Sequence, residues 1–280
     1  MSSELTLQEQ ALLVMSLTDL TSLDDKDNFN SIQDLCSKAI NPYQHTAAVC
    51  VYKEFAAYAK YLLNNQVKVA TVINFPDGAL DFTRFTFEYA YALSQQVDEI
   101  DYVFPWRKLI ELTQDQEYEF KDLSQVTNNS AYQEMREIMQ KYLQPLCNNQ
   151  NTKIKVILES GSLTPLQIAI ASQICLDYGV DFIKTSTGKH GEGAKLTDAE
   201  IIFKLIKLNQ SKTGFKASGG IKTVAQAMEY INLGAKILGQ DFIAPQTFRF
   251  GASGIYKDII SILTHGKSIS SQELGQASSY

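Results

Sequence analysis

Short β-branched or aromatic runs recur along the chain, and each is followed by a stretch long enough to form a helix. This alternation is typical of a parallel sheet with crossover helices. An open doubly wound sheet usually has about five or six strands and a glycine-rich first turn, whereas here Lys53-Glu54-Phe55 follows the first run. The pattern therefore predicts a (β/α)8 TIM barrel. Its eight strands are expected over residues 46–52, 68–75, 98–104, 153–160, 181–187, 214–220, 236–241 and 248–253.

The chain length suits one such barrel. The protein has 280 residues, of which 45% are hydrophobic, and single α/β barrels commonly run to about 250 residues. No internal repeat or interdomain linker is evident. A last short helix is expected over 255–263, and His265-Gly266 ends the regular structure. We therefore expect one barrel domain over residues 1–266 and a flexible, polar C-terminal tail over 267–280.

The covering helices and connections are less regular. The spacing of the apolar residues between 132 and 143 predicts one helix face, with Pro145 as its stop signal. The apolar residues are Tyr132, Met135, Ile138, Met139, Tyr142 and Leu143. The polar segment 111–130 is expected to form an extended loop or the start of a helix.

Charge and terminal sequence exclude several classes of protein. The formal net charge is −6 and the 25 lysines and arginines are scattered, so no basic stripe indicates a nucleic-acid partner. The first ten residues lack a basic region followed by an apolar run, and no stretch of about 18 apolar residues occurs. We expect no membrane association and a cytoplasmic protein.

The four cysteines are widely spaced, which fits reduced thiols better than a disulfide framework or a zinc site. They are Cys36, Cys50, Cys147 and Cys175.

Charged residues stand at or near the carboxyl ends of predicted strands, where barrel enzymes build their active sites. These residues are Asp101, Glu159, Lys184 and Lys216. A charge inside a barrel loses hydration and must be paired or shift its pKa. A lysine attacks a carbonyl only when neutral, and a second ammonium group nearby lowers its pKa. Two lysines from neighbouring strands, with a carboxylate two strands away, therefore indicate amine chemistry. The alternative is that each lysine is only a strand-end surface charge.

Glycine clusters follow three of the last four predicted strands, at 187–189, 219–222 and 251–254. Loops after the last strands of a barrel often hold a phosphate with backbone N–H groups, which glycine allows to approach closely. With Lys189 and Lys222 adjacent, the clusters favour a phosphorylated substrate.

The three histidines lack a metal-binding spacing, so no metal is expected. His190 is expected to be exposed, Cys50 to lie in the core, and Trp106 to cap the barrel rim.

Several segments resemble the signature segments of the deoxyribose-phosphate aldolase family, in that family's order. They are DEIDYVFPWR, KVILESGSL, DFIKTSTGK, GFKASGGIK and FRFGAS, with support from LTDLTSLDD, VCVY, INFPDG and the terminal Ser-Ser-Tyr. The resemblance covers almost the whole chain. It implies reversible cleavage of 2-deoxy-D-ribose 5-phosphate to D-glyceraldehyde 3-phosphate and acetaldehyde, a lyase reaction of deoxyribonucleotide catabolism and carbohydrate degradation, without metal or organic cofactor.

The resemblance also implies residue roles. Lys184 would be the Schiff-base nucleophile, Lys216 the cation that lowers its pKa, and Asp101 the acid/base acting through water. The phosphate would be held by Gly188, Lys189, Gly219, Gly220, Gly251 and Ser253, and the pocket would be lined by Asp19, Thr21 and Cys50. Tyr280 would fold back into the site to assist proton exchange, whereas an inert terminal tail is the alternative. The chain departs from the pattern at Lys222, where arginine is usual, and at Gly254, where serine is usual.

Two rival functions remain open. One is another Schiff-base barrel aldolase, of the transaldolase type, and the other is a non-catalytic barrel that binds sugar phosphates. Binding alone gives no reason to bury two ammonium groups together, which disfavours the second rival. The expected partners are small phosphorylated sugars and aldehydes, with the chain acting as a monomer or a homodimer.

Overall fold

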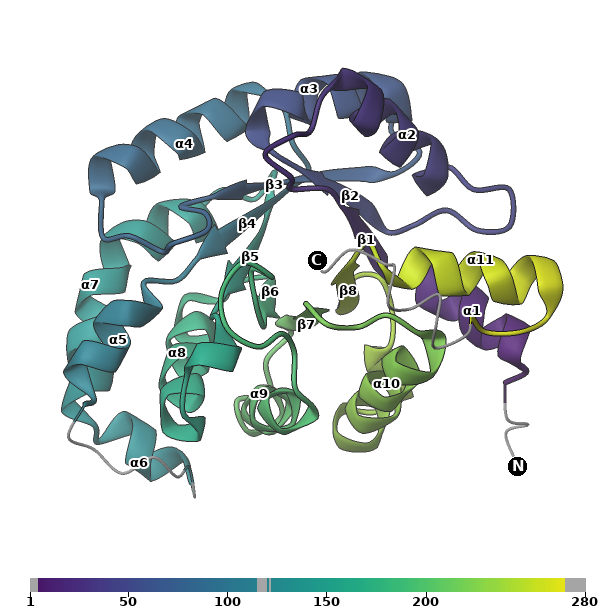
Figure 1. Cartoon of the computed structure of the whole chain (residues 1–280). Helices are drawn as coiled ribbons and strands as arrows, with labels where there is room; N and C mark the ends of the chain where they lie inside the picture. Colours follow the sequence, from purple (N-terminus) through teal and green to yellow (C-terminus); the bar gives the residue numbers. More distant parts are fainter. Residues whose placement is uncertain (1–4, 115–119, 121, 270–280) are drawn as a thin grey trace.

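The computed structural model describes residues 5–114, 120 and 122–269, and its eight parallel strands close into a barrel (Figure 1). Each strand pairs with the next, and β8 pairs with β1. The predicted (β/α)8 fold is thus confirmed. The strands are β1 Thr18–Thr21, β2 Ala48–Val51, β3 Lys68–Ile73, β4 Glu99–Val103, β5 Lys153–Ile157, β6 Phe182–Lys184, β7 Gly214–Ser218 and β8 Phe248–Ala252.

Helices surround the barrel and bury the outward-facing residues of the strands (Figure 1). None of the described helices is long and apolar enough to cross a membrane. The α-helices are α1 Leu7–Ser16, α2 Phe29–Ala39, α3 Lys53–Leu63, α4 Phe82–Ser94, α5 Trp106–Leu112, α6 Leu123–Thr127, α7 Ser130–Cys147, α8 Pro165–Tyr178, α9 Leu196–Leu208, α10 Val224–Leu238 and α11 Ile255–His265, and the 3-10 helices are η1 Ser160–Ser162 and η2 Gln240–Phe242.

The strand prediction over 236–241 is wrong. Residues 236–238 form the last turn of α10, whose buried positions Ala227, Tyr230, Ile231 and Gly234 follow a helical spacing, and Gly239 ends it at φ +98°. The strand that the prediction missed is β1. It has only four residues, one of them an aspartate, so its composition is poor for a strand. With β1 added, each predicted strand from 46–52 to 214–220 moves up by one place, so the run at 214–220 contains β7. The run at 248–253 still contains the eighth strand.

The predicted face of α7 is confirmed, since five of its six apolar residues are buried and Ile138 packs against the core. Pro145 does not stop the helix, which continues to Cys147. A proline lacks the backbone N–H group of one helical hydrogen bond, and its ring crowds the carbonyl group one turn earlier. Because Pro145 lies in the last turn, the helix loses little by this and continues for two more residues. The polar segment 111–130 contains the end of α5 and a short α6, which a capping box of Asp122 and Gln125 begins.

The C-terminal helix α11 extends to His265, and Gly266 caps it in the left-handed conformation at φ +71°. The first residues after it are held to that helix, because the backbone N–H of Ile269 donates to Asp258 Oδ1 at 2.9 Å and the Ser268 hydroxyl donates to the same oxygen. The rest of the predicted tail, including Tyr280, lies outside the described residues.

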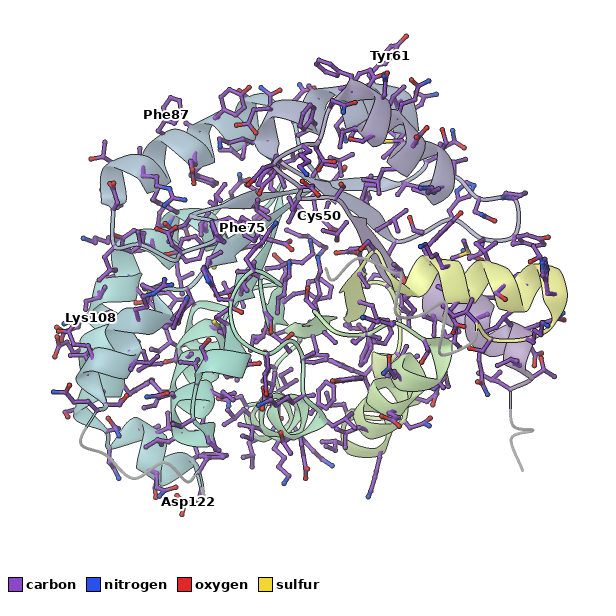
Figure 2. All side chains as sticks on the ribbon, viewed as in Figure 1. Cys50, Tyr61, Phe75, Phe87, Lys108 and Asp122 are labelled. Carbon is purple, nitrogen blue, oxygen red and sulfur yellow. The ribbon has the colours of Figure 1, made fainter. Side chains whose placement is uncertain are left out.

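Apolar side chains occur both in the buried barrel and on the exposed side of the helix layer. Cys50 is fully buried on β2, as expected, whereas Tyr61 on α3 and Phe87 on α4 are exposed on the outside of the helix layer (Figure 2). The candidate active-site residues come from the strands and their carboxyl ends.

Candidate active site

Parallel register places the charged residues of neighbouring strands side by side inside the barrel. Asp101 on β4 is in register with Lys155 on β5, and Lys184 on β6 is in register with Lys216 on β7, which is itself in register with Arg249 on β8. Side chains alternate between the two faces of a strand, so residues in register share the interior. The predicted trio of Asp101, Lys184 and Lys216 therefore meets in one place, with Asp101 two strands from Lys184.

Asp101 is the centre of this cluster and accepts hydrogen bonds from three lysines. Lys155 Nζ donates to Oδ1 at 2.8 Å, and the Nζ atoms of Lys184 and Lys216 both donate to Oδ2 at 2.9 Å. All four residues are buried. One carboxylate thus connects three amines through hydrogen bonds, an arrangement that can pass protons among them.

A second set of contacts links the lysines to further carboxylates. Lys216 Nζ donates to Asp19 Oδ2 at 2.6 Å, and Lys155 Nζ lies 2.6 Å from Glu99 Oε2. The Arg249 guanidinium donates to Asp19 Oδ1 and, at 3.1 Å, to Glu99 Oε1. Arg249 therefore connects the partners of both lysines, and its own exposure is only 4%.

The charges of this buried cluster do not balance. It contains three carboxylates, from Asp19, Glu99 and Asp101, and four basic groups, from Lys155, Lys184, Lys216 and Arg249. Among the described residues, three of the basic groups each have two or more carboxylates within 4 Å, whereas Lys184 has Asp101 alone. The cluster is neutral when one of its four basic groups loses a proton, and Lys184, which contacts the fewest carboxylates, is the group least stabilised in its protonated form.

The pKa shifts follow this difference. Burial, assisted by the nearby Lys216 ammonium, lowers the pKa of Lys184, although Asp101 opposes the shift. Burial also disfavours the charged form of Lys216, but Asp101 and Asp19 outweigh it and raise the pKa of Lys216. The three lysines hold the pKa of Asp101 well below its usual range despite burial. Lys184 is therefore the member of the cluster most able to present a neutral amine.

Other expected pocket residues surround this cluster. Asp19 is fully buried on β1, and Thr21 at the end of that strand is half-buried and donates to the Asp19 carbonyl at 2.9 Å. Burial raises the pKa of the Cys50 thiol to about 11, which fits its expected place in the core rather than a nucleophile. Glu159, just beyond β5, accepts a hydrogen bond from the Thr187 hydroxyl, and burial raises its pKa.

Five of the six predicted phosphate residues lie in the loops after β6, β7 and β8, whereas Gly251 lies within β8. Gly188, Gly219 and Gly220 have φ between +77° and +85°, a region that favours glycine. A Cβ on Gly219 would lie 3.8 Å from the Gly188 Cα, so these two loops adjoin, and Lys189 follows Gly188. Gly251 has a different environment: a Cβ there would lie 2.9 Å from Lys216 Cε, so this glycine makes room for the lysine.

Ser253, Lys222 and Gly254 lie together at the start of α11. The Ser253 Oγ atom is buried and has no hydrogen-bond partner among the described residues. A Cβ on Gly254 would lie 3.7 Å from Lys222 Cγ, so the two departures from the family pattern are neighbours.

Sequence reasoning missed Lys155, Glu99 and Arg249. A signal was present, because each is a charged residue within a predicted strand. Glu99 also precedes Asp101 by two residues, so the two side chains share one face of their strand. The expectation that His190 is exposed is wrong. Its ring lies 6.1 Å from that of Trp106, which is buried at the start of α5, and its Nε2 atom is buried. Among the described residues, no group of three or more His, Cys, Asp or Glu side chains could hold a metal ion.

Comparisons with known proteins relate the chain to a family of aldolases. The sequence model of the DeoC/LacD family aldolases matches residues 13–253. A solved structure from Coccidioides immitis, provisionally assigned as a deoxyribose-phosphate aldolase, is 26% identical with a TM-score of 0.68, over 88% of this chain and 85% of that one. QR15, an aldolase, is 25% identical with a TM-score of 0.65, over 89% and 96% of the two chains.

Two further structures share the fold at lower identity. One from Toxoplasma gondii, also provisionally assigned as a deoxyribose-phosphate aldolase, is 20% identical with a TM-score of 0.74, over 94% of this chain and 98% of that one. The tetrameric deoxyribose phosphate aldolase of Aeropyrum pernix is 21% identical with a TM-score of 0.66, over 92% and 97%. Because the family match spans most of the chain, this protein belongs to the DeoC/LacD aldolase family.

Proposed function

We propose that the protein is a class I deoxyribose-phosphate aldolase, which cleaves 2-deoxy-D-ribose 5-phosphate to acetaldehyde and D-glyceraldehyde 3-phosphate through a Schiff base on Lys184. The observation that carries the proposal is the uneven charge of the buried cluster. Lys184 alone among its basic groups has a single carboxylate within 4 Å, so it is the amine that loses its proton most easily.

The reaction begins when the Lys184 amine adds to the C1 aldehyde of the open-chain sugar, and loss of water gives a protonated imine. A base then removes the proton of the C3 hydroxyl, and the C2–C3 bond breaks, releasing D-glyceraldehyde 3-phosphate. The electron pair of that bond passes into an enamine, with the imine as electron sink. Protonation at C2 and hydrolysis release acetaldehyde and restore the Lys184 amine.

Asp101 is proposed to move these protons through water. Its hydrogen bonds to Lys155, Lys184 and Lys216 place its carboxylate beside the reacting amine, and its lowered pKa keeps it ionised as a proton acceptor. Lys216 remains an ammonium ion because of Asp101 and Asp19, and its charge favours the neutral form of Lys184. The adjoining glycine loops after β6 and β7 are proposed to hold the substrate phosphate with their backbone N–H groups.

Turnover with defined substrates tests the proposal. Purified protein should release acetaldehyde and D-glyceraldehyde 3-phosphate from 2-deoxy-D-ribose 5-phosphate, and Lys184→Arg should reduce that release to a trace because a guanidinium does not form an imine. Lys204→Arg, on the exposed face of α9, is the matched control. Cleavage of a ketose phosphate instead would indicate the transaldolase type, and full turnover by Lys184→Arg would refute the assigned nucleophile.

A further inference from the structure

Glu159 is a buried carboxylate that takes no part in the proposed reaction. It follows β5 directly before η1, and its side chain is fully buried. Its backbone has φ +59° and ψ +48°, in the left-handed region that a long side chain rarely adopts. A buried charge and a strained backbone are both unfavourable, and such positions cluster at functional sites. The contacts of Glu159 therefore indicate what it does.

The Glu159 carboxylate is bonded to Thr187, the residue at the start of the loop after β6. In the described part of the chain, Thr187 supplies every hydrogen bond that this carboxylate accepts. The Thr187 hydroxyl donates to Oε2 at 2.5 Å, and the Thr187 backbone N–H donates to the same oxygen at 3.3 Å. That hydroxyl also accepts from the backbone N–H of Lys189 at 3.0 Å. Because Glu159 takes the hydroxyl hydrogen, the lone pairs of the hydroxyl remain for Lys189.

These hydrogen bonds determine the shape of the turn that contains Gly188. The N–H groups of Thr187 and Lys189 are both used within the chain, whereas that of Gly188 donates to no described acceptor. Gly188 is exposed and has φ +77°, so the turn presents its backbone to the barrel mouth. The chain of contacts from Glu159 through Thr187 to Lys189 thus leaves one N–H group of the turn available to a ligand.

The residues that follow Glu159 pack against the rest of the same loop. A Cβ on Gly161 would lie 1.8 Å from the Glu192 carbonyl oxygen, so the two backbones touch and a larger residue does not fit. The Ser160 hydroxyl donates to Asp198 Oδ2 at 2.8 Å, which connects η1 to the first turn of α9. The loop after β6 is therefore held by η1 at its end as well as by Glu159 at its start.

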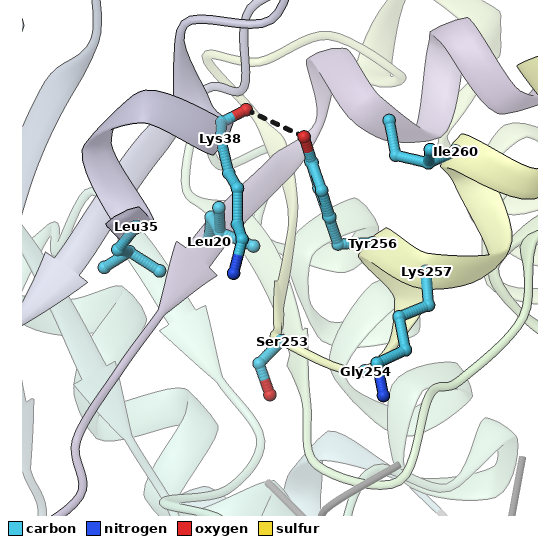
Figure 3. A pocket seen from close by; sticks show the side chains of 8 residues that line it. All are labelled: Leu20, Leu35, Lys38, Ser253, Gly254, Tyr256, Lys257 and Ile260. Carbon is cyan, nitrogen blue, oxygen red and sulfur yellow. Dashed lines mark hydrogen bonds between the residues drawn. The ribbon is translucent and has the colours of Figure 1, made fainter. Parts of the chain in front are cut away.

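The loop after β8 is packed differently. Ser253 and Gly254 border a cavity of about 490 Å³ between α2 and α11 (Figure 3). Across this cavity the Tyr256 hydroxyl donates to the Lys38 carbonyl at 3.2 Å, which ties the two helices together. The loop after β6 instead meets η1 at direct backbone contact. The β6 side of the barrel mouth is therefore the firmer surface against which a substrate can be aligned.

We propose that Glu159 is a positioning residue of the active site. Through the Thr187 hydroxyl, it holds the turn of Gly188 and Lys189 in its binding shape before the substrate arrives. This inference rests on the proposed function, in which that turn contacts the substrate, and it adds a residue that acts without touching the substrate. A loop that is already ordered loses less conformational entropy on binding, so the contribution of Glu159 belongs to KM.

Hydrogen–deuterium exchange tests the positioning role without requiring turnover. In Glu159→Leu, the peptide over residues 185–195 should exchange about tenfold faster than in the wild type, because the turn opens locally. Glu159→Gln keeps an oxygen that can accept from Thr187 and should exchange like the wild type. Thr213→Val, which removes a buried hydroxyl with two hydrogen bonds at the amino end of β7, is the matched control.

Wild-type exchange of this peptide in Glu159→Leu would overturn the proposal. If Glu159→Leu does not fold, Glu159→Gly makes the same test, because glycine adopts φ +59° without strain.

A double-variant cycle tests whether Glu159 and Thr187 act through one contact. Glu159→Leu and Thr187→Val should each raise KM for 2-deoxyribose 5-phosphate by about tenfold and change kcat by less than about twofold. The double variant should resemble either single variant, since both remove the same hydrogen bond. A rise of about a hundredfold in the double variant, or a loss in kcat alone, would overturn the positioning role. If the wild type does not cleave the sugar, the proposed function fails, while the exchange result still decides whether Glu159 holds the turn.

Discussion

Replacing Arg249 with methionine tests the charge balance of the buried cluster. The variant would have three carboxylates and three basic groups, so a protonated Lys184 would complete a neutral cluster instead of adding an excess charge. We therefore expect the pKa of Lys184 to rise. Removing one partner of a buried ion pair also leaves Asp19 and Glu99 partly unpaired, which costs about 3–5 kcal/mol of folding free energy.

The size of the pKa change follows from the barrel register. Arg249 is in register with Lys216, and Lys216 with Lys184, so their backbones are two strand spacings apart, and we take that spacing, about 9.6 Å, as the distance between the two charges. At an effective dielectric constant of about 20, a unit charge at that distance contributes about 1.7 kcal/mol. Its removal should raise the apparent pKa of the reactive amine by about 1.3.

The assay is the pH dependence of kcat/KM for retro-aldol cleavage, whose rise with pH reports the ionisation of the free enzyme. The rising limb should move to higher pH by about 1.3 in Arg249→Met. Arg249→Lys keeps the charge and should leave the limb in place, although urea unfolding should still show lost stability. If Arg249→Met does not fold, Arg249→Gln carries the same charge test. An unmoved limb in a folded, charge-deleted variant would refute the charge-balance argument.

Three further variants address the remaining groups. Lys216→Leu removes the cation beside Lys184 and should shift the pH profile of cleavage upward by about one pH unit or more; an unchanged profile would show that Lys216 is not the electrostatic partner. Asp101→Asn should reduce turnover by about a hundredfold or more while imine formation with acetaldehyde persists, and equal loss of both would contradict a role in proton transfer. Ser253→Asp should raise KM for 2-deoxyribose 5-phosphate by about tenfold or more and that for 2-deoxyribose far less, and parallel losses would place the phosphate elsewhere.

The sequence predicts the barrel because its strongest strands are apolar, β-branched runs followed by long amphipathic helices. It fails at β1, whose four residues include Asp19, because burial inside a closed barrel compensates for the poor strand propensity of that aspartate. It fails in the opposite direction at residues 236–241, where the local composition suits a strand but α10 continues to Leu238 and η2 begins at Gln240.

The central trio of the site is also predictable, because Asp101, Lys184 and Lys216 stand on apolar strands where a charge is costly. We expected charged site residues near the carboxyl ends of strands, but Asp101, Lys155 and Lys216 each occupy the middle of a five-residue strand. Lys155 and Arg249, which is the second residue of β8, were therefore missed although they stand on apolar strands like the trio. Their importance depends on register between strands far apart in sequence, such as the contact between Arg249 and Asp19 across 230 residues.

Covalent trapping tests the central claim most directly. The protein is incubated with acetaldehyde and reduced with borohydride, and the modified peptide is identified by mass spectrometry. The account predicts one reduced adduct, on Lys184, and none in Lys184→Arg, while the Lys204→Arg control is modified like the wild type. An adduct on Lys155 or Lys216 in place of Lys184, or no adduct in an active enzyme, would contradict it.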